Sequence, residues 1–267
     1  IHHAEFYPVS DGIEANIPRL KDLTDRGYSV VIFPEGTRSE DCSILRFHHG
    51  AFYLAEQLKL DILPIFIHGV GHVLPKRDFM LRKGSIYMEV CQRITPTDTS
   101  LGADYKQRTH AFRRYYREHF EEIKRAKEDT NYFLPYVNYK FMYKGSTNES
   151  HCRKMLKKST SFKSYIEADY SGAHTTWIMN SGHGEFAWLF ALVNKGVDVY
   201  AFETDEEKRN LADGCSRKPK NLHFCALPEN DNELTEYPQA DCCLALLENG
   251  KEADKRFEKY HPQWIRI

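Results

Sequence analysis

Apolar residues along the first hundred positions alternate between helical and strand-like patterns. An amphipathic helix is expected up to Gly27, because apolar side chains recur before it at helical spacing. Residues 28–33 predict a short buried strand. Residues 62–67 predict a second apolar strand, in which Pro64 indicates an edge or a bend. A helix is expected over 50–60, and a third strand is expected over 85–91, with Ile86, Met88 and Val90 on one face. This order predicts an α/β domain with a largely parallel sheet.

The rest of the chain starts with a long helix and then alternates again. Residues 103–128 predict a helix with an aromatic-rich apolar stripe, and Leu134-Pro135 is expected to mark a boundary after it. From residue 175 onward, strands and helices alternate as in the beginning of a doubly wound parallel sheet. The predicted strands cover 175–179, 197–202, 222–226 and 242–247.

The predicted fold class is therefore α/β, in two parts. Residues 1–128 are expected to form a partial α/β domain, residues 129–165 a basic helical linker, and residues 166–267 a second, truncated Rossmann-like α/β domain. The first residue is Ile1 and no signal-peptide pattern follows it, so the chain is expected to be a piece of a longer protein.

Composition excludes several classes of protein. The chain has 267 residues, and its formal net charge of -1 argues against a wholly basic nucleic-acid-binding protein. No apolar run approaches the about 18 residues that a transmembrane helix needs. The 7 cysteines include no Cys-x-x-Cys pair, which indicates reduced thiols in the cytoplasm rather than disulfides or a zinc site. His68 and His72 lack a third ligand at a recognisable spacing, so no metal site is predicted.

Residues 138–163 form a basic stretch with interleaved aromatic residues, and Glu149 is its acid. Two interpretations stay open. The stretch could lie on anionic lipid, where each basic residue contributes about 1 kcal/mol near the surface. It could equally be a plain basic helix between two domains. Its cations are Lys140, Lys144, Arg153, Lys154, Lys157, Lys158 and Lys163.

The most specific motif is the loop that follows the first predicted strand. Gly36 permits close approach of a ligand to the backbone, and Arg38 offers a planar fork suited to phosphate. Thr37 and Ser39 add hydroxyl donors, and Glu35 can orient Arg38 or a ligand hydroxyl. We interpret Glu35, Gly36, Thr37, Arg38 and Ser39 as a binding site for an anionic substrate.

This loop, Phe33 to Ser39, resembles the third sequence block of the 1-acylglycerol-3-phosphate type of glycerolipid acyltransferases. Residues 47–51 and 62–65 are similar to segments that follow in the same family. The resemblance implies transfer of a fatty acyl group from acyl-CoA or acyl-carrier protein to a hydroxyl of a lysolipid. It also implies that the five loop residues hold the acceptor, that no cofactor is needed, and that the protein works in the cytoplasm at the inner face of the membrane.

The family's catalytic block, His-x-x-x-x-Asp, does not occur in this sequence, because none of the 13 histidines is followed by aspartate at the fifth position. We therefore assign no catalytic residue and expect that block upstream of Ile1. His48 and His49 are interpreted as a surface or helix-start pair rather than as a substitute base. Since a general base is typically worth about 10²–10⁴-fold in rate, the chain alone is expected to turn over poorly.

The second half has its own resemblance. Asn180 to Gly184, a following helix and Glu203 after the next strand resemble the first motifs of class I S-adenosylmethionine methyltransferases. That resemblance implies cofactor binding by Gly182, Gly184 and Glu203. Because Ile178 and Asn180 depart from the pattern, we interpret the segment as a degenerate form of that fold. The order of the two segments is also similar to the C-terminal region of bacterial exporter, acyltransferase and methyltransferase fusions. The alternatives are a methyltransferase or a non-catalytic protein that binds a membrane surface; the sequence does not indicate the oligomeric state.

Overall fold

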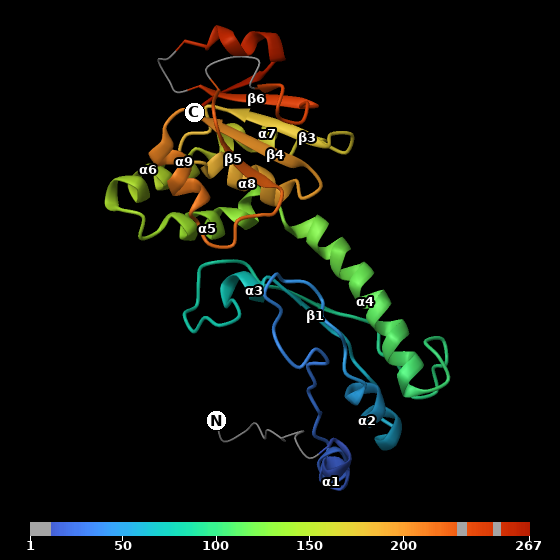
Figure 1. The fold of residues 1–267 in the computed structure, drawn as a ribbon. Coiled ribbons are helices and arrows are strands. Elements are labelled where there is room, and N and C mark those ends of the chain that lie inside the picture. Colours follow the sequence, from blue (N-terminus) through green and yellow to red (C-terminus); the bar gives the residue numbers. More distant parts are fainter. Residues whose placement is uncertain (1–11, 229–233, 248–251) are drawn as a thin grey trace. The chain divides into compact units, whose positions relative to one another are not determined.

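The strands form two separate sheets, one in each half of the chain (Figure 1). The structure is a computed structural model and describes residues 12–228, 234–247 and 252–267. It divides into two units, residues 1–125 and 126–267. Strands and helices alternate in both units, which confirms the α/β class.

The first unit packs a short antiparallel strand pair against a long helix. Strands β1 (Ile65–His68) and β2 (Tyr87–Val90) pair antiparallel, so the expected largely parallel sheet is wrong for the described part of this unit. The long predicted helix is confirmed as α4 (Tyr105–Lys127). The other helical segments are η1 (Glu14–Asn16), α1 (Ile17–Asp25), α2 (Gly50–Leu58) and α3 (Val70–Val73).

Helix α4 decides which face of this strand pair is buried. Phe66 of β1 stacks on Tyr116 of α4 at a centroid distance of 3.8 Å, and Glu89 of β2 lies 2.7 Å from His119 of α4. The opposite face, which carries the predicted set of Ile86, Met88 and Val90, is exposed. The exposed fractions are 54% for Ile86, 59% for Met88 and 59% for Val90.

Residues 28–33 are the second correction in this unit. They have no strand partner among the described residues, and Val31 and Phe33 are 78% and 72% exposed. An apolar run becomes a buried strand only where a neighbouring strand and a covering layer are present. Neither is present for this segment in the described part of the chain.

The second unit is built on a parallel sheet with strand order β5-β4-β3-β6-β7. Every pairing in it is parallel, as expected for a doubly wound fold. The predicted sheet is confirmed and gains one strand, β7, which the apolar pattern does not predict. The strands are β3 (Thr175–Met179), β4 (Asp198–Glu203), β5 (Leu222–Ala226), β6 (Cys242–Leu247) and β7 (Gln263–Arg266).

Helix α8 (Glu185–Val193) is the centre of the core of this unit. Its residues from Phe186 to Ala191 are at most 1% exposed, and the indole of Trp188 donates to the carbonyl of Ala212 at 3.2 Å. The other helical segments are α5 (Thr130–Phe141), α6 (Ser146–Lys157), α7 (Ser159–Ile166), α9 (Glu206–Asp213) and η2 (Lys255–Tyr260).

Residues 129–165 are helical, as expected, but they belong to the second unit. The boundary predicted at Leu134-Pro135 is wrong, because α5 runs through Pro135. That helix is capped by Asp129, whose side chain accepts from the Tyr132 amide at 2.8 Å. Its buried face, with Phe133 at 1% and Val137 at 0% exposure, packs into the core. The free energy of this apolar burial offsets the cost of the backbone hydrogen bond that the proline removes.

Two cations of the basic stretch 138–163 are structural. Lys140 is 5% exposed and donates to the Ser216 carbonyl at 2.6 Å, and Lys144 donates to the Gly214 carbonyl at 3.2 Å. Both bonds tie the start of the stretch to the end of α9. This part of the stretch therefore stabilises the fold rather than presenting charge to a lipid surface.

Candidate functional site

The predicted substrate loop is an exposed turn in the first unit. The Gly36 amide donates to the Phe33 carbonyl at 3.0 Å, which closes the turn after Pro34. Thr37 is exposed and Ser39 half-buried, and their hydroxyls make no hydrogen bond within the described part of the chain. The loop therefore presents polar groups to solvent at one edge of the unit.

Arg38 is anchored at one side of its guanidinium group. Its Nη1 donates to the carbonyl oxygens of Leu74 at 2.9 Å and Pro75 at 3.2 Å. The side chain is exposed, and its Nη2 and Nε atoms make no hydrogen bond to the described residues. A planar guanidinium held this way keeps the N–H groups of Nη2 and Nε available for an anion.

Glu35 is bonded to the segment that follows the loop and not to Arg38. Its Oε2 accepts from the Leu45 amide at 2.8 Å, so the carboxylate holds residues 42–46 against the loop instead of orienting Arg38. Burial raises the pKa of Glu35, against the lowering effects of the Leu45 amide and the Arg113 guanidinium. Arg113 completes the arrangement by donating its Nε proton to the Leu45 carbonyl at 3.0 Å.

Gly36 lies directly against His48, a contact that the sequence did not indicate. Gly36 has φ +68, and a Cβ added to it would meet His48 Cδ2 at 3.4 Å and Nε2 at 3.5 Å. The His48 amide also donates to the Pro34 carbonyl at 2.8 Å. The imidazole of His48 thus borders the loop, ten residues away from Arg38 in sequence, and is the exposed titratable ring at this site.

In the second unit, the predicted cofactor loop lies between β3 and α8. Gly182 has φ +61, and no atom lies within 4 Å of a Cβ added there, so this glycine borders open space. Gly184 has φ +89, and an added Cβ would lie 2.7 Å from Ala212 Cβ and 2.8 Å from the Phe224 ring. Gly184 is therefore required for packing at the start of α8, whereas Gly182 leaves room for a ligand.

The carboxylate of Glu203 is hydrogen-bonded to the same loop. Its Oε2 accepts from the Gly182 amide at 2.7 Å, and its Oε1 accepts from the Asp205 amide at 3.1 Å and the Thr204 hydroxyl at 3.2 Å. The side chain is buried, at 7% exposure. A carboxylate that receives three protein donors fits the holding of a loop better than the binding of ribose hydroxyls. The residues thus do not fit S-adenosylmethionine well, and we derive no step through this cofactor.

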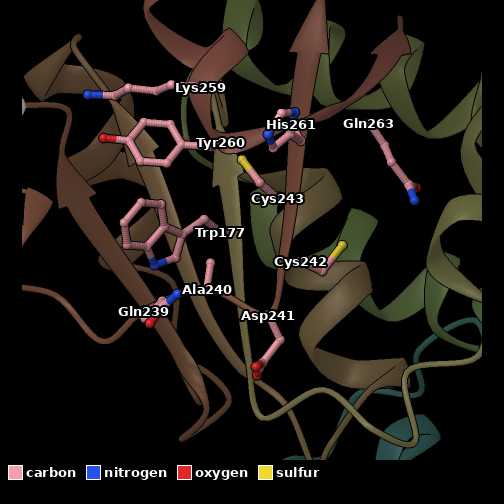
Figure 2. A pocket seen from close by; sticks show the side chains of 10 residues that line it. All are labelled: Trp177, Gln239, Ala240, Asp241, Cys242, Cys243, Lys259, Tyr260, His261 and Gln263. Carbon is pink, nitrogen blue, oxygen red and sulfur yellow. The ribbon is translucent and has the colours of Figure 1, made fainter.

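An open pocket of about 510 Å³ lies elsewhere in the second unit (Figure 2). Trp177 and Tyr260 form one wall, with ring centroids 5.3 Å apart. Cys242 and Gln263 are the first residues of β6 and β7, so the pocket lies at the amino ends of these strands, whereas open parallel sheets bind ligands at the carboxyl ends. Asp241 at its edge accepts from the amides of His174 and Thr175 at 2.7 and 2.9 Å. We interpret this pocket as a structural recess.

Comparison with known proteins finds acyltransferases that are similar to part of the chain. Residues 12–68 match the family model described as Acyltransferase. A 1-acyl-sn-glycerol-3-phosphate acyltransferase of Chlamydomonas reinhardtii is 35% identical over 81 residues, which are 30% of this chain and 24% of that protein. The human beta enzyme of the same name is 29% identical over 114 residues, 41% of each chain. The chain thus spans well under half the length of these relatives, and the resemblance of its first unit to acyltransferases is shown.

The solved structures found in the comparison include an acyltransferase and a methyltransferase. The 1-acyl-sn-glycerophosphate acyltransferase PlsC of Thermotoga maritima shares 26% identity, covers 42% of this chain and 44% of its own, and has a TM-score of 0.36. The plantazolicin methyltransferase BpumL shares 12% identity, with coverage of 49% and 50% and a TM-score of 0.26. Among the described residues, no helix is both long and apolar enough to cross a membrane.

Proposed function

We propose that the first unit binds the acceptor of a glycerolipid acyltransferase of the 1-acylglycerol-3-phosphate type. The acyl donor would be acyl-CoA or acyl-carrier protein, and the acceptor a lysolipid with a phosphate group. The observation that carries this proposal is the half-anchored guanidinium of Arg38 on the loop that the family model covers.

The chemistry of the loop supports a phosphate ligand. The carbonyls of Leu74 and Pro75 fix the plane of the Arg38 guanidinium, which reduces the conformational entropy lost on binding. The remaining N–H groups can donate to two oxygens of one phosphate. The hydroxyls of Thr37 and Ser39 lie on the same loop and can add further donors. The loop thus positions an acceptor, and the group that removes the proton from its attacking hydroxyl is not assigned.

We expect Arg38→Gln to weaken binding of a soluble short-chain lysophosphatidate by roughly tenfold or more, because charge-assisted hydrogen bonds are worth about 1.5–3 kcal/mol. Isothermal titration of the 267-residue chain would measure this. Arg93→Gln is the matched control, because Arg93 is an exposed arginine of the same unit that pairs with Asp61 at 3.2 Å. Equal affinity of the Arg38 variant and the control variant would exclude the proposed acceptor site.

A second exposed loop supports binding of the first unit to an anionic membrane surface. Residues 79–81 expose three consecutive apolar side chains, with Phe79 at 90%, Met80 at 61% and Leu81 at 76%. Arg77 and Lys83 flank them and are exposed. Arg82 and Asp78 close the base of the loop with an ion pair of 2.5 Å. Exposed apolar side chains between cations are suited to insertion among anionic lipids.

The residue that anchors Arg38, Pro75, also bonds to the start of the exposed loop at residues 78–82. The carbonyl of Pro75 accepts both from Arg38 Nη1 at 3.2 Å and from the Asp78 amide at 3.1 Å. The proposed acceptor site therefore lies next to the loop that would touch the lipid surface. A lysolipid could enter the site with its acyl chain still in the bilayer.

Vesicle co-sedimentation would test this membrane contact. We expect the double variant Phe79→Ser/Leu81→Ser to partition onto phosphatidylglycerol-containing vesicles with a coefficient at least about tenfold lower than that of the unaltered chain. Burial of each side chain contributes about 1.5–3 kcal/mol. Tyr143→Ser, at 82% exposure in the second unit, is the control. Unchanged partitioning of the loop variant, or an equal loss in the control, would contradict the proposal.

A further inference from the structure

Three metal-ligand side chains meet in the second unit, near the start of α8. His151 lies on α6, His183 in the loop before α8, and Glu185 is the first residue of α8. Each offers one ligand atom, and these atoms all lie within 4.8 Å of one another. The imidazole centroids of the two histidines are 4.1 Å apart, and His151 Nε2 lies 3.8 Å from Glu185 Oε1.

Two atoms of this cluster are buried without a hydrogen bond. Glu185 is 3% exposed, and its Oε1 has no hydrogen-bond partner. His183 Nδ1 is likewise buried without one. Buried polar atoms in native proteins almost always have a partner, so an orphaned carboxylate oxygen and an orphaned imidazole nitrogen in one cluster point to an absent ligand. Because both atoms can donate electron pairs, a cation satisfies both at once.

We propose that His151, His183 and Glu185 bind a divalent transition-metal ion, with zinc as the ion that this ligand set suits best. Zinc binds histidine nitrogen and glutamate oxygen at about 2.0–2.2 Å, which places tetrahedral ligand atoms about 3.3 Å apart. The observed 3.8 Å between His151 and Glu185 needs only a small closure to reach this. Three protein ligands leave a fourth position open to water or another ligand.

A metal ion can reach this cluster from solvent on the side of His151. The side chain of His151 is 40% exposed, whereas that of Glu185 is 4% exposed, so one ligand faces solvent and another closes the inner side. A second group of comparable composition, Glu89, Cys91 and His119 in the first unit, differs in the pairing of its histidine. Both ring nitrogens of His119 already contact carboxylates, Glu89 at 2.7 Å and Glu122 at 3.1 Å. That group therefore serves as an internal comparison.

Titration of the metal-free 267-residue chain with Zn²⁺ would test the site. We expect binding of one ion and a loss of affinity of at least about 100-fold in both His151→Asn and Glu185→Gln, since even partners outside the ligand sphere contribute 10–100-fold. His174→Asn, an exposed histidine of the same unit, and His119→Asn are the controls and should retain full affinity. His151 is exposed enough for its variant to fold, and tryptophan fluorescence would verify this.

Substitution with Co²⁺ gives an independent readout. All 7 cysteines are free thiols, and their thiolates could bind metal instead. The proposed site contains only nitrogen and oxygen ligands, so the Co²⁺ spectrum should lack a thiolate charge-transfer band. A thiolate band, binding lost only in His119→Asn, or equal Zn²⁺ affinity of His151→Asn and the unaltered chain would overturn the proposal.

Discussion

Gly184→Ala is expected to destabilise the second unit by about 2–5 kcal/mol. The added Cβ would lie 2.7 Å from Ala212 Cβ and 2.8 Å from the Phe224 ring, with φ +89. Overpacking of a core costs about 1–3 kcal/mol, and a left-handed backbone costs a residue other than glycine a further 1–2 kcal/mol or so. These neighbours belong to α9 and β5, so relief would require movement of the sheet or its covering helix.

Urea unfolding followed by tryptophan fluorescence would measure this loss. The 3 tryptophans, Trp177, Trp188 and Trp264, all lie in the second unit, so their emission reports on this unit alone. Gly182→Ala is the matched control: it also has a positive φ, +61, but a Cβ there meets nothing within 4 Å. We expect it to cost only about 1–2 kcal/mol. Equal losses in the two variants would show that packing against Ala212 and Phe224 is unimportant.

Glu203→Ala is expected to lower the stability of the same unit by about 2–4 kcal/mol. The substitution leaves the amides of Gly182 and Asp205 without their acceptor. A hydrogen bond to a charged group contributes about 1.5–3 kcal/mol, and the exposed Asp205 amide loses less than the half-buried Gly182 amide because water can replace its acceptor. Glu203→Gln keeps one carbonyl oxygen and should lose less. The urea midpoint of these two variants, again by tryptophan fluorescence, provides the measurement.

Calorimetry with S-adenosylmethionine separates the two roles of Glu203. If the carboxylate holds the loop, stability falls and the cofactor gives no more heat with the unaltered chain than with Glu203→Ala. An unchanged urea midpoint together with weaker cofactor binding in Glu203→Ala would instead favour ribose recognition by this residue and revive the methyltransferase hypothesis.

The sequence predicted the second unit well because its central strands, β3 and β6, are buried on both faces. Such strands are continuous apolar runs, and residues 175–179 and 242–247 form β3 and β6 with the predicted bounds. Asp205 precedes α9 as an N-cap, a residue type that marks helix starts in a sequence, and its side chain accepts from the amides of Glu207 and Lys208. Strand β7 is short and alternates apolar with polar residues, so the same criterion did not find it.

Local pattern alone therefore determined the α/β class and the parallel sheet of the second unit, because each depends on residues close together in sequence. Only tertiary packing decided the rest. Alternation in residues 85–91 shows which side chains share a face, but α4 decided that Tyr87 and Glu89 are covered and Met88 is exposed. Likewise, His151 meets His183 because α6 packs on α8, a contact across 32 positions that no spacing in the sequence encodes.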